Sequence, residues 1–331
     1  MPKISIIIHL TAQENIANLC IESLLKQTFQ DFECLCVLSD AEKEYPFLTT
    51  LSKKNKKFKI LKQINSPSKW HCYNEALYQM KGEYALFLND SDLLHPQALD
   101  IYMDALRYSH ADIATANPFY FSGTKKIKSL EKKIAFEKSS LKKKNNNLIA
   151  EFWQENLPYI DETLEGKMFS QTILAYLKFH PSLCEFAPYF FVEQFYSMAQ
   201  SLVYIRHQLY FYRKEAHIPS VASYETLMNL KERISFEYAY FVDDGRISSY
   251  TETLLNHRCS QDLFLAVKHI LTHTPERSFI CINQQIVTMI EDLKDFGLLK
   301  GLSLSLVQKS ILWALTKGHL SLAKKLIQFF Y

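Results

Sequence analysis

Glycine is scarce in this sequence. Only 7 of the 331 residues are glycine, and neither G-x-G-x-x-G nor G-x-x-x-x-G-K occurs in the chain. Loops that cradle phosphates through closely approaching backbone amides depend on such glycines. Sites built on a glycine-rich phosphate loop are therefore excluded.

Paired cysteines and long apolar runs are also missing. The 7 cysteines form no C-x-x-C pair and have no histidines at zinc-site spacing. Cys34 and Cys36 alternate in an apolar segment, where cysteine packs as a small hydrophobe. The N-terminus lacks the charged segment, long apolar stretch and cleavage site of a signal peptide, and no apolar run reaches the length of about 18 residues that a spanning helix needs. We therefore expect reduced thiols and a cytoplasmic chain without a membrane span.

The chain as a whole has little excess charge, because its net charge is only +3. Residues 125–144 nevertheless contain nine lysines and two glutamates. Such a run is typical of a solvated surface, and the alternative is an acidic partner such as a lipid-linked phosphate, an anionic membrane leaflet or a charged glycan. The lysine runs lack the interleaved aromatic residues of a base-stacking platform, so we expect no nucleic-acid partner.

What is present is an alternation of short apolar runs and amphipathic segments in a chain that is 48% hydrophobic. Helices are expected at residues 14–27 and 71–80, and strands at residues 4–8, 32–38, 60–61, 84–88 and 112–116. The strand, helix and strand within residues 4–38 predict a parallel pair with a right-handed crossover. The alternation as a whole predicts a doubly wound α/β domain.

One of these strands ends in acidic residues. The apolar run Tyr84–Leu88 is followed directly by Asn89-Asp90-Ser91-Asp92, and Pro96 then fits the first turn of a helix. Open α/β sheets bind ligands at the C-terminal edge of their strands, and two neighbouring carboxylates there suit a divalent cation that also holds substrate phosphates. The alternative is a polar turn in which aspartate caps the next helix, and the motif by itself favours this alternative.

The second half of the chain is rich in aromatic residues and then becomes helical. Spacing predicts a helix at residues 191–202, strands at 203–205 and 209–212, and helices from residue 224 onward. The end of the chain reads as a helical hairpin with Gly318 as a helix C-cap. We therefore predict two domains, residues 1–224 and an all-helical domain of residues 225–331.

Six stretches, in order between residues 3 and 222, together resemble the family 2 inverting glycosyltransferases of the GT-A fold. They include the strand end Phe87-Leu88-Asn89-Asp90-Ser91-Asp92, the element Gly166-Lys167-Met168-Phe169 and the strand Leu209-Tyr210-Phe211-Tyr212-Arg213. The first of these also includes residues 74–77 and 81–84, which precede it, and the other three stretches are residues 4–8, 21–33 and 192–196. Each motif is weak alone, but their common order makes the resemblance specific.

The resemblance implies a Rossmann-like, mostly parallel sheet flanked by helices. It implies transfer of a sugar from a nucleotide-diphosphate sugar to a glycan or lipid-linked acceptor, by single displacement with inversion. Mg²⁺ or Mn²⁺ would neutralise the diphosphate leaving group, and a carboxylate would take the proton of the acceptor hydroxyl. The corresponding role is synthesis of surface polysaccharide or lipopolysaccharide on the inner face of the plasma membrane.

Site residues are carried over by position. Asp92 falls on the last acid of the family's acidic motif and is the predicted metal ligand, with Asp90 as a second ligand or donor contact. Glu193 falls on the catalytic base, and its alternative role is an ordinary acid at a helix start. Arg213 is predicted to contact the diphosphate, or else to be solvated at a strand end. His217 is a third metal ligand or leaving-group contact, although a single loop histidine is more often neither.

Several departures from the family fall on the nucleotide pocket. His9-Leu10-Thr11-Ala12 stands where the family has Pro-x-Tyr-Asn, and Leu38-Ser39-Asp40-Ala41 where it has Asp-Asp-Gly-Ser. Asp40 is predicted to replace the missing nucleotide contact. The arginine expected before Asn74 is absent, and Lys69 is the nearest basic residue. Either the donor is unusual, or the domain has lost catalysis and acts as a glycan-binding or partner subunit through its helical domain.

The C-terminal segment offers a second membrane signal. Lys324 and Lys325 lie beside Leu326, Ile327 and Phe329. A basic amphipathic helix of this kind fits peripheral attachment to a membrane. The alternative is a terminal helix packed into the core, which the sequence favours somewhat.

Overall fold

The computed structural model describes residues 2–38, 44–62, 68–123, 127, 130, 132–135, 137–138, 141–145, 147–155, 157–214, 224–273, 284, 286–288, 291, 305–317 and 319–330. The chain forms two compact units. The first comprises Met1–Pro181 with Ala187–Pro219, and the second comprises Ser182–Phe186 with Ser220–Tyr331. The sequence predicted a domain boundary after residue 224.

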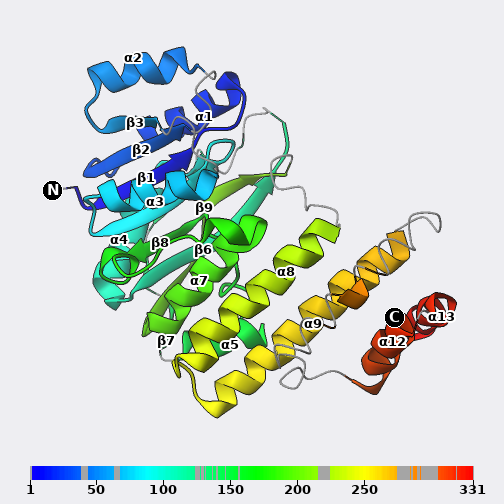
Figure 1. The fold of residues 1–331 in the computed structure, drawn as a ribbon. Helices are drawn as coiled ribbons and strands as arrows, with labels where there is room; N and C mark the ends of the chain where they lie inside the picture. The colour runs from blue at the N-terminus through cyan, green and yellow to red at the C-terminus, as the bar shows by residue number, and fades with distance from the viewer. Residues whose placement is uncertain are drawn as a thin grey trace. The chain divides into compact units, whose positions relative to one another are not determined.

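The first unit is built on one sheet, which contains nine strands within the described residues (Figure 1). Its strand order is β3-β2-β1-β4-β8-β6-β9-β5, and β7 also pairs with β9. The bounds are β1 Ile4–His9, β2 Phe32–Leu38, β3 Phe58–Lys62, β4 Tyr84–Asn89, β5 Leu93–Leu94, β6 Ile113–Phe121, β7 Leu141–Asn145, β8 Lys167–Ser170 and β9 Ser201–Arg213.

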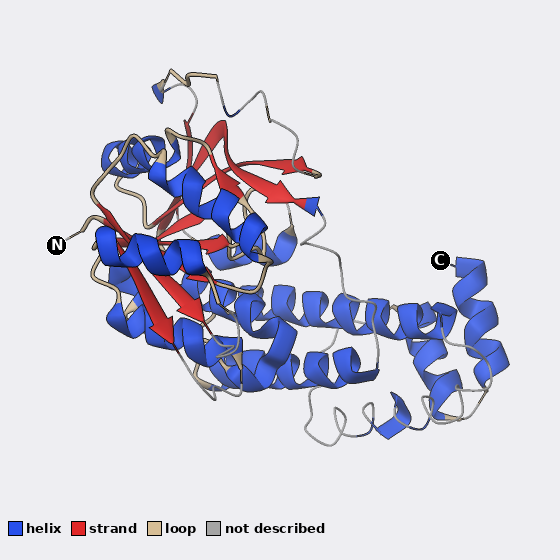
Figure 2. Cartoon of the chain, turned by 90° about the horizontal axis from the view of Figure 1, so that it is seen from above, coloured by secondary structure: helices blue, strands red, loops and turns tan. Residues whose placement is uncertain are grey.

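Strands β1 to β4 pair in parallel, and β8 runs antiparallel between β4 and β6. Every residue of β1 and of β2 is buried, which explains why these strands read as continuous apolar runs rather than as alternating ones. Helices lie on both sides of the sheet (Figure 2). These features confirm the predicted α/β class.

The helices of the first unit are α1 Glu14–Leu25, α2 Pro46–Lys54, α3 Lys69–Gln79, α4 Ala98–Ser109, α5 Leu148–Gln154, α6 Gln171–Leu174 and α7 Ala187–Met198. Helix α3 is fixed by Asn74, whose side chain exchanges hydrogen bonds of 2.7 and 2.9 Å with the backbone of Phe179. Gly82, in the turn before β4, lies so close to β1 that a Cβ there would come within 2.4 Å of the Ser5 nitrogen. Both contacts set where β4 enters the sheet.

Three predicted elements differ from the structure. The helix expected at residues 191–202 is α7, which begins at Ala187 and ends at Met198. The two strands expected at 203–205 and 209–212 are one strand, β9, because the polar residues between them continue the pairing with β6 through a register shift. The end of the lysine run, residues 141–145, forms β7 on the outer side of β9.

The second unit is helical in its described residues, as predicted. Its helices are α8 Tyr224–Glu237, α9 Ser249–His273, α12 Leu306–Thr316 and α13 Leu320–Phe330, and a π-helical turn follows α8 at Tyr238–Asp243. Arg233 of α8 is buried and forms ion pairs with Glu237 and with Asp262 of α9. No helix among the described residues is long and apolar enough to cross a membrane.

Candidate active site

The acidic stretch Asn89-Asp90-Ser91-Asp92 forms a tight turn at the end of β4. The Asn89 side-chain oxygen accepts hydrogen bonds from the Ser91 backbone nitrogen at 3.1 Å and the Ser91 hydroxyl at 2.7 Å. The Asp92 backbone nitrogen donates to the Asn89 carbonyl at 3.0 Å. Because β1 and β4 end in register, with His9 opposite Asn89, the turn faces the segment that follows β1.

Asp90 binds that segment. Its carboxylate accepts hydrogen bonds from the backbone nitrogens of Thr11 and Ala12, the latter at 2.6 Å, and the side chain is 1% exposed. A hydrogen bond from a backbone amide to a carboxylate is charge-assisted and therefore stronger than one between neutral groups. Asp90 therefore fixes the loop that replaces the family's Pro-x-Tyr-Asn, whatever else it contacts.

Asp92 binds the other side of the site, at the end of β9. Its carboxylate accepts hydrogen bonds from the Tyr210 hydroxyl at 2.9 Å and from the Arg213 backbone nitrogen at 2.7 Å. The Tyr210 hydroxyl in turn accepts from the Asn89 backbone nitrogen at 3.1 Å. The two aspartates thus join the ends of β1, β4 and β9 at one point of the sheet edge.

Arg213 places a cation beside these acids. Its Nε donates to the Ser91 carbonyl at 2.9 Å, a second nitrogen donates to the Gly123 carbonyl, and the guanidinium lies over the Phe121 ring at 4.6 Å. The side chain is buried, so these contacts hold it in one orientation. Its predicted contact with a diphosphate stays a prediction.

Burial and the two acids act together on the pKa values of neighbouring groups. Burial raises the pKa of the Cys20 thiol, and the charges of Asp90 and Asp92 raise it further. Burial and Asp92 likewise raise the pKa of the Tyr210 hydroxyl. Such an environment favours a bound cation or a cationic side chain over a second anion.

A divalent cation fits this site only in part. The described residues contain no group of three His, Cys, Asp or Glu side chains able to hold a metal ion. Mg²⁺ commonly takes one or two carboxylates and completes its shell with water and substrate phosphates. Asp92 and Asp90 supply that number of carboxylates, so they fit a cation that binds together with the donor. His217 and Asp40 lie outside the described residues.

Glu193 lies on α7. The family motif suggested a helix start, but α7 begins at Ala187 and Glu193 is in its interior. Its side chain is fully buried and accepts a hydrogen bond from the Trp153 indole nitrogen at 2.6 Å. The match to the helix start was wrong because α7 begins earlier than its apolar spacing indicated. The role of Glu193 as catalytic base stays a prediction.

Sequence reasoning missed the turn of Glu165 and Gly166, which precedes β8. The Tyr212 hydroxyl donates to the Glu165 carbonyl at 2.9 Å, and the Tyr102 hydroxyl donates to the Gly166 carbonyl at 2.6 Å. The motif around Gly166 was recognised, but nothing in its spacing indicated that this turn packs against Tyr210 and Tyr212 of β9. The structure shows this, because a Cβ on Gly166 would come within 2.6 Å of the Tyr212 hydroxyl and 3.1 Å of the Tyr210 ring.

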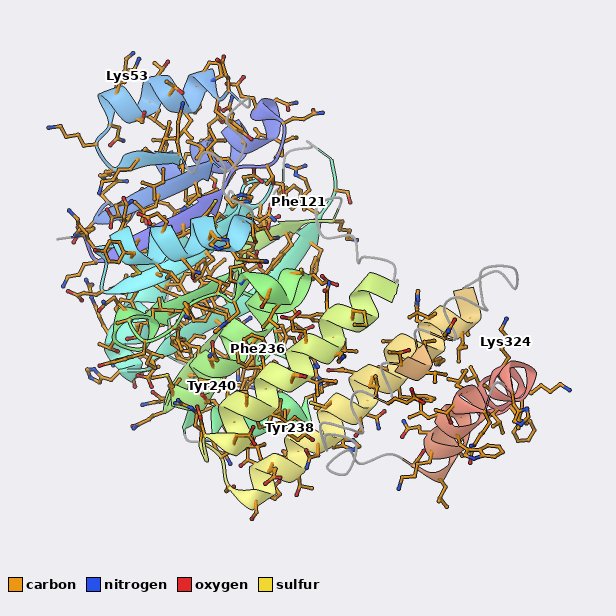
Figure 3. The ribbon with its side chains drawn as sticks, viewed as in Figure 1. Lys53, Phe121, Phe236, Tyr238, Tyr240 and Lys324 are labelled. Carbon is orange, nitrogen blue, oxygen red and sulfur yellow. The ribbon has the colours of Figure 1, made fainter. Side chains whose placement is uncertain are left out.

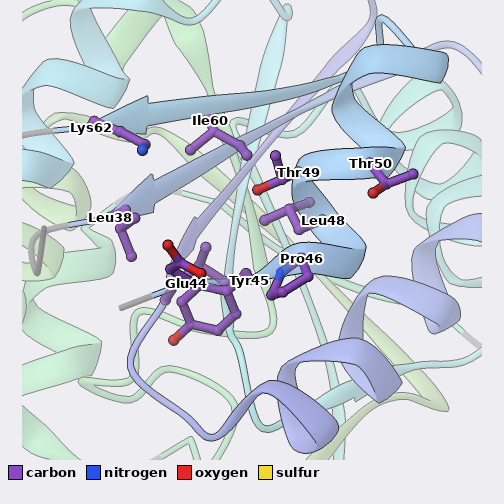
Figure 4. A pocket seen from close by; sticks show the side chains of 10 residues that line it. Leu38, Glu44, Tyr45, Pro46, Leu48, Thr49, Thr50, Ile60 and Lys62 are labelled. Atoms are coloured by element: carbon purple, nitrogen blue, oxygen red, sulfur yellow. The ribbon is translucent and has the colours of Figure 1, made fainter. Parts of the chain in front are cut away.

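A pocket of about 380 Å³ lies next to the acidic site, between α2 and the ends of β2 and β3 (Figure 4). The Tyr45 hydroxyl donates to the Ala12 carbonyl at 2.9 Å, so the pocket wall and Asp90 hold the same loop. The lining residues are Leu10, Leu38, Glu44, Tyr45, Pro46, Leu48, Thr49, Thr50, Ile60 and Lys62.

Comparison with known proteins identifies relatives of this arrangement. Residues 5–165 match the family model described as glycosyl transferase family 2. A curated relative from Bacillus spizizenii, poly(ribitol-phosphate) beta-glucosyltransferase, is 31% identical over 117 residues, which are 34% of this chain and 18% of that protein. The chain therefore spans about a fifth of that relative's length.

Solved structures show the same fold. Residues 1–349 of S. aureus TarS in complex with UDP-GlcNAc match with a TM-score of 0.71 at 14% identity, over 98% of this chain and 90% of that one. The longer TarS structure matches with a TM-score of 0.65 at 15% identity, over 98% of this chain and 55% of that one. At these identities the likeness concerns the fold alone, and it confirms the predicted GT-A architecture with its helical C-terminal region.

Proposed function

We propose, from the match of residues 5–165 to the glycosyl transferase family 2 model, that the chain transfers a sugar from a nucleotide-diphosphate sugar to a hydroxyl group of a cell-surface polymer, with inversion. The observation that carries the proposal is the meeting of Asp90, Asp92 and Arg213 at the ends of β4 and β9. Buried acids and a fixed cation at this edge are suited to a diphosphate and its counter-ion.

The donor is proposed to be a UDP sugar. The TarS structures contain UDP-GlcNAc or UDP, and the Bacillus relative is named a glucosyltransferase. The pocket beside α2 suits the nucleobase, because it shares the Thr11–Ala12 loop with Asp90 and thus adjoins the proposed diphosphate site. Tyr45 supplies an aromatic ring in place of the missing family tyrosine. Asp40 is proposed to contact the nucleotide.

A divalent cation is proposed to bind with the donor. Asp92 would be its main protein ligand, with Asp90 and His217 as further candidates. When bound, Mg²⁺ or Mn²⁺ would stabilise the charge that develops on the departing diphosphate. Arg213 holds a fixed positive charge next to the same acids and is proposed to contact the diphosphate directly.

The acceptor is proposed to be a hydroxyl-bearing surface polymer or its lipid-linked precursor, and the chain is proposed to work at the inner face of the plasma membrane. The second unit offers a surface for this. In α12 and α13, Leu306, Trp313 and Phe329 are 83, 54 and 81% exposed. No acidic residue follows Asp295 in the sequence, whereas five lysines do. Exposed apolar side chains among lysines fit an anionic lipid surface.

The proposal is tested with the full chain and a panel of UDP, GDP and CDP sugars. Release of free nucleotide is measured with and without Mn²⁺, and with and without poly(ribitol phosphate) as acceptor probe. We expect turnover of a UDP sugar that the polymer accelerates. Absence of binding and turnover with every nucleotide would contradict the proposal and support a non-catalytic partner subunit.

A further inference from the structure

The lysine-rich segment after β6 is anchored to the first unit at its start. Residues 132–145, which we call the basic segment, contain six lysines and one glutamate. The Lys132 carbonyl lies 2.9 Å from Nε2 of His95. The backbone of Ile134 exchanges hydrogen bonds of 2.7 and 3.1 Å with the Gln97 side chain, and the Ile134 side chain packs against the hydrophobic core. The start of the basic segment is therefore fixed on the turn that leads into α4.

The basic segment is anchored again at its end. Its last five residues form β7, which pairs with β9. Leu141 packs against the same core, and the Lys143 ammonium donates to the Ser109 carbonyl at 2.7 Å. Because Gln97 is the N-cap of α4 and Ser109 is its last residue, the segment follows this helix over its 12 residues, about 18 Å.

These anchors leave lysine side chains exposed along the segment. The Lys138 ammonium lies 4.3 Å from the centre of the Tyr108 ring, and Lys144 pairs with Glu151. Glu137 is exposed as well. Because the backbone that carries these charges is already ordered, binding an extended polyanion costs less conformational entropy than it would with a disordered lysine tail. The exposed lysine side chains that the anchoring contacts do not use are Lys132, Lys133, Lys138 and Lys142.

The basic segment starts next to the acidic site. His95, which holds the start of the segment, follows Asp92 by three residues, and its backbone nitrogen donates to the Leu209 carbonyl of β9 at 2.9 Å. Where the chain leaves β6, the Gly123 carbonyl accepts a hydrogen bond from Arg213. An acceptor chain whose reacting hydroxyl lies at the acidic site can therefore continue onto the lysines along α4.

We propose that the basic segment binds the anionic backbone of the acceptor, a phosphodiester polymer, while a hydroxyl of the same polymer reaches the acidic site. This inference rests on the proposed function. Lysine ammonium groups bind phosphate as point charges on flexible stems, so they suit a flexible polymer of repeated phosphates. An anionic membrane suits the segment less, because its described residues include no exposed large apolar side chain that would enter the lipid.

Binding is measured without turnover, by calorimetric titration of the full chain with inorganic polyphosphate. The test variant combines Lys132→Gln, Lys133→Gln, Lys138→Gln and Lys142→Gln. Exposed charge pairs contribute modestly each, so we expect this variant to bind about 10–100-fold more weakly than wild type. If each lysine neutralises one phosphate, and about 0.7 counter-ions are released per phosphate as on single-stranded nucleic acid, the slope of log K against log salt should become smaller by about 3.

The control variant removes the same charge from another part of the first unit. It combines substitutions of four exposed lysines, Lys26→Gln, Lys53→Gln, Lys54→Gln and Lys56→Gln. Its affinity for polyphosphate should stay within about twofold of wild type, since one modest exposed charge contact at most is affected.

Transfer assays show whether the segment acts on the acceptor. With poly(ribitol phosphate), the KM for the polymer should rise about 10-fold or more in the test variant, whereas kcat and the rate of UDP-sugar hydrolysis without acceptor stay within about twofold of wild type. Such a change in KM alone indicates lost substrate binding. Monomeric ribitol phosphate is too short to follow α4, so its KM should be the same in both proteins.

Equal polyphosphate affinity in wild type and the test variant, or an equal loss in the test and control variants, would overturn the inference. A test variant that keeps polymer binding but no longer sediments with phosphatidylglycerol vesicles would also overturn it, in favour of a membrane contact. If the test variant melts below wild type, its two halves, Lys132→Gln with Lys133→Gln and Lys138→Gln with Lys142→Gln, are measured separately, and each should weaken binding about 3–10-fold. The two proposals fail separately: a wild-type chain that turns over no donor contradicts the proposed function, whereas polymer transfer that is unaffected in the test variant contradicts this inference.

Discussion

At the scale of single residues, the two aspartates of the acidic stretch bind different parts of the chain. Asp90 holds the loop after β1 through its backbone amides, whereas Asp92 holds the end of β9 through Tyr210 and Arg213. The sequence predicted both as ligands because it showed only their spacing. The sequence could not show which hydrogen-bond donors each carboxylate binds, because those donors are about 80 and 120 residues away along the chain.

Removing the Asp90 carboxylate should loosen the loop after β1, which it holds through the Thr11 and Ala12 amides. We expect Asp90→Ala to lower the free energy of unfolding by about 1.5–3 kcal/mol, since its hydrogen bonds from the backbone amides of Thr11 and Ala12 to a charged group are lost. Urea unfolding followed by tryptophan fluorescence measures the change. Asp104→Ala, a partly exposed aspartate on α4, is the control and should change stability by less than about 0.5 kcal/mol.

Gly166 should tolerate no side chain. Gly166→Ala adds both the strain of a positive φ and a collision with Tyr212. Gly245 has a similar φ of +64° with open space around it, so Gly245→Ala reports the backbone strain alone. We expect about 1 kcal/mol of destabilisation for Gly245→Ala and clearly more for Gly166→Ala, together with weaker UDP binding only in the latter. Equal effects of the two variants would show that the contact with the tyrosines is unimportant.

At the scale of elements, the sequence predicted best where strands are buried on both faces. Strands β1, β2 and β4 were found close to their observed bounds because continuous apolar runs indicate them directly. Strand β8 and helix α2 were missed, since β8 has only four residues and α2 has one buried residue. Helix α7, expected at residues 191–202, was misplaced because it is buried on almost all sides, so its apolar residues define no single face from which its ends could be located.

The entry to β8 should respond to acid. Lys167 is 1% exposed and pairs with Asp161. Burial alone would raise the pKa of Asp161, but Lys167 and Thr163 hold it below its ordinary value. The pair therefore stabilises the fold at pH values above the unfolded-state pKa of an aspartate, near 3.9. This contribution is lost as the pH falls through the lower folded-state pKa of Asp161.

Urea unfolding at pH 5, 4 and 3 measures this loss. Asp161→Asn combined with Lys167→Met removes the pair, so its free energy of unfolding should fall less steeply between pH 4 and 3 than that of wild type. Identical slopes for the two proteins would contradict the predicted role of the pair.

At the scale of the whole molecule, the order of weak motifs along the chain carried more information than any one of them. It predicted the GT-A fold, which is confirmed although the aligned TarS chains are only 14–15% identical. The proposed nucleotide pocket was less predictable. The aromatic ring that lines it, Tyr45, comes from the segment before α2, whereas the family motif places a tyrosine after β1.

Membrane binding should depend on the exposed face of α12 and α13. Figure 3 shows Lys324 extending from α13. We expect the full chain to sediment with vesicles containing phosphatidylglycerol but not with neutral vesicles. Because each lysine near an anionic surface contributes about 1 kcal/mol, Lys309→Gln combined with Lys325→Gln should weaken binding by roughly thirtyfold.

The matched control for the apolar contribution is an exposed aromatic residue of the first unit. Trp313→Ser combined with Phe329→Ser should also weaken vesicle binding. Tyr78→Ser, at a side chain that is 87% exposed, should not. Binding that is unchanged in both double variants would exclude this face as the membrane contact.

The central claim is that the end of β4 binds the diphosphate of the donor. Calorimetric titration of UDP into wild type and Asp92→Asn, with Mn²⁺ or with EDTA, tests it most directly, and Asp104→Asn controls for the change in charge. We predict that Mn²⁺ strengthens binding to wild type and that Asp92→Asn, with its fold retained, weakens it by about 10–100-fold, which corresponds to the loss of one charged contact. UDP affinity that is the same in wild type and Asp92→Asn would contradict the claim.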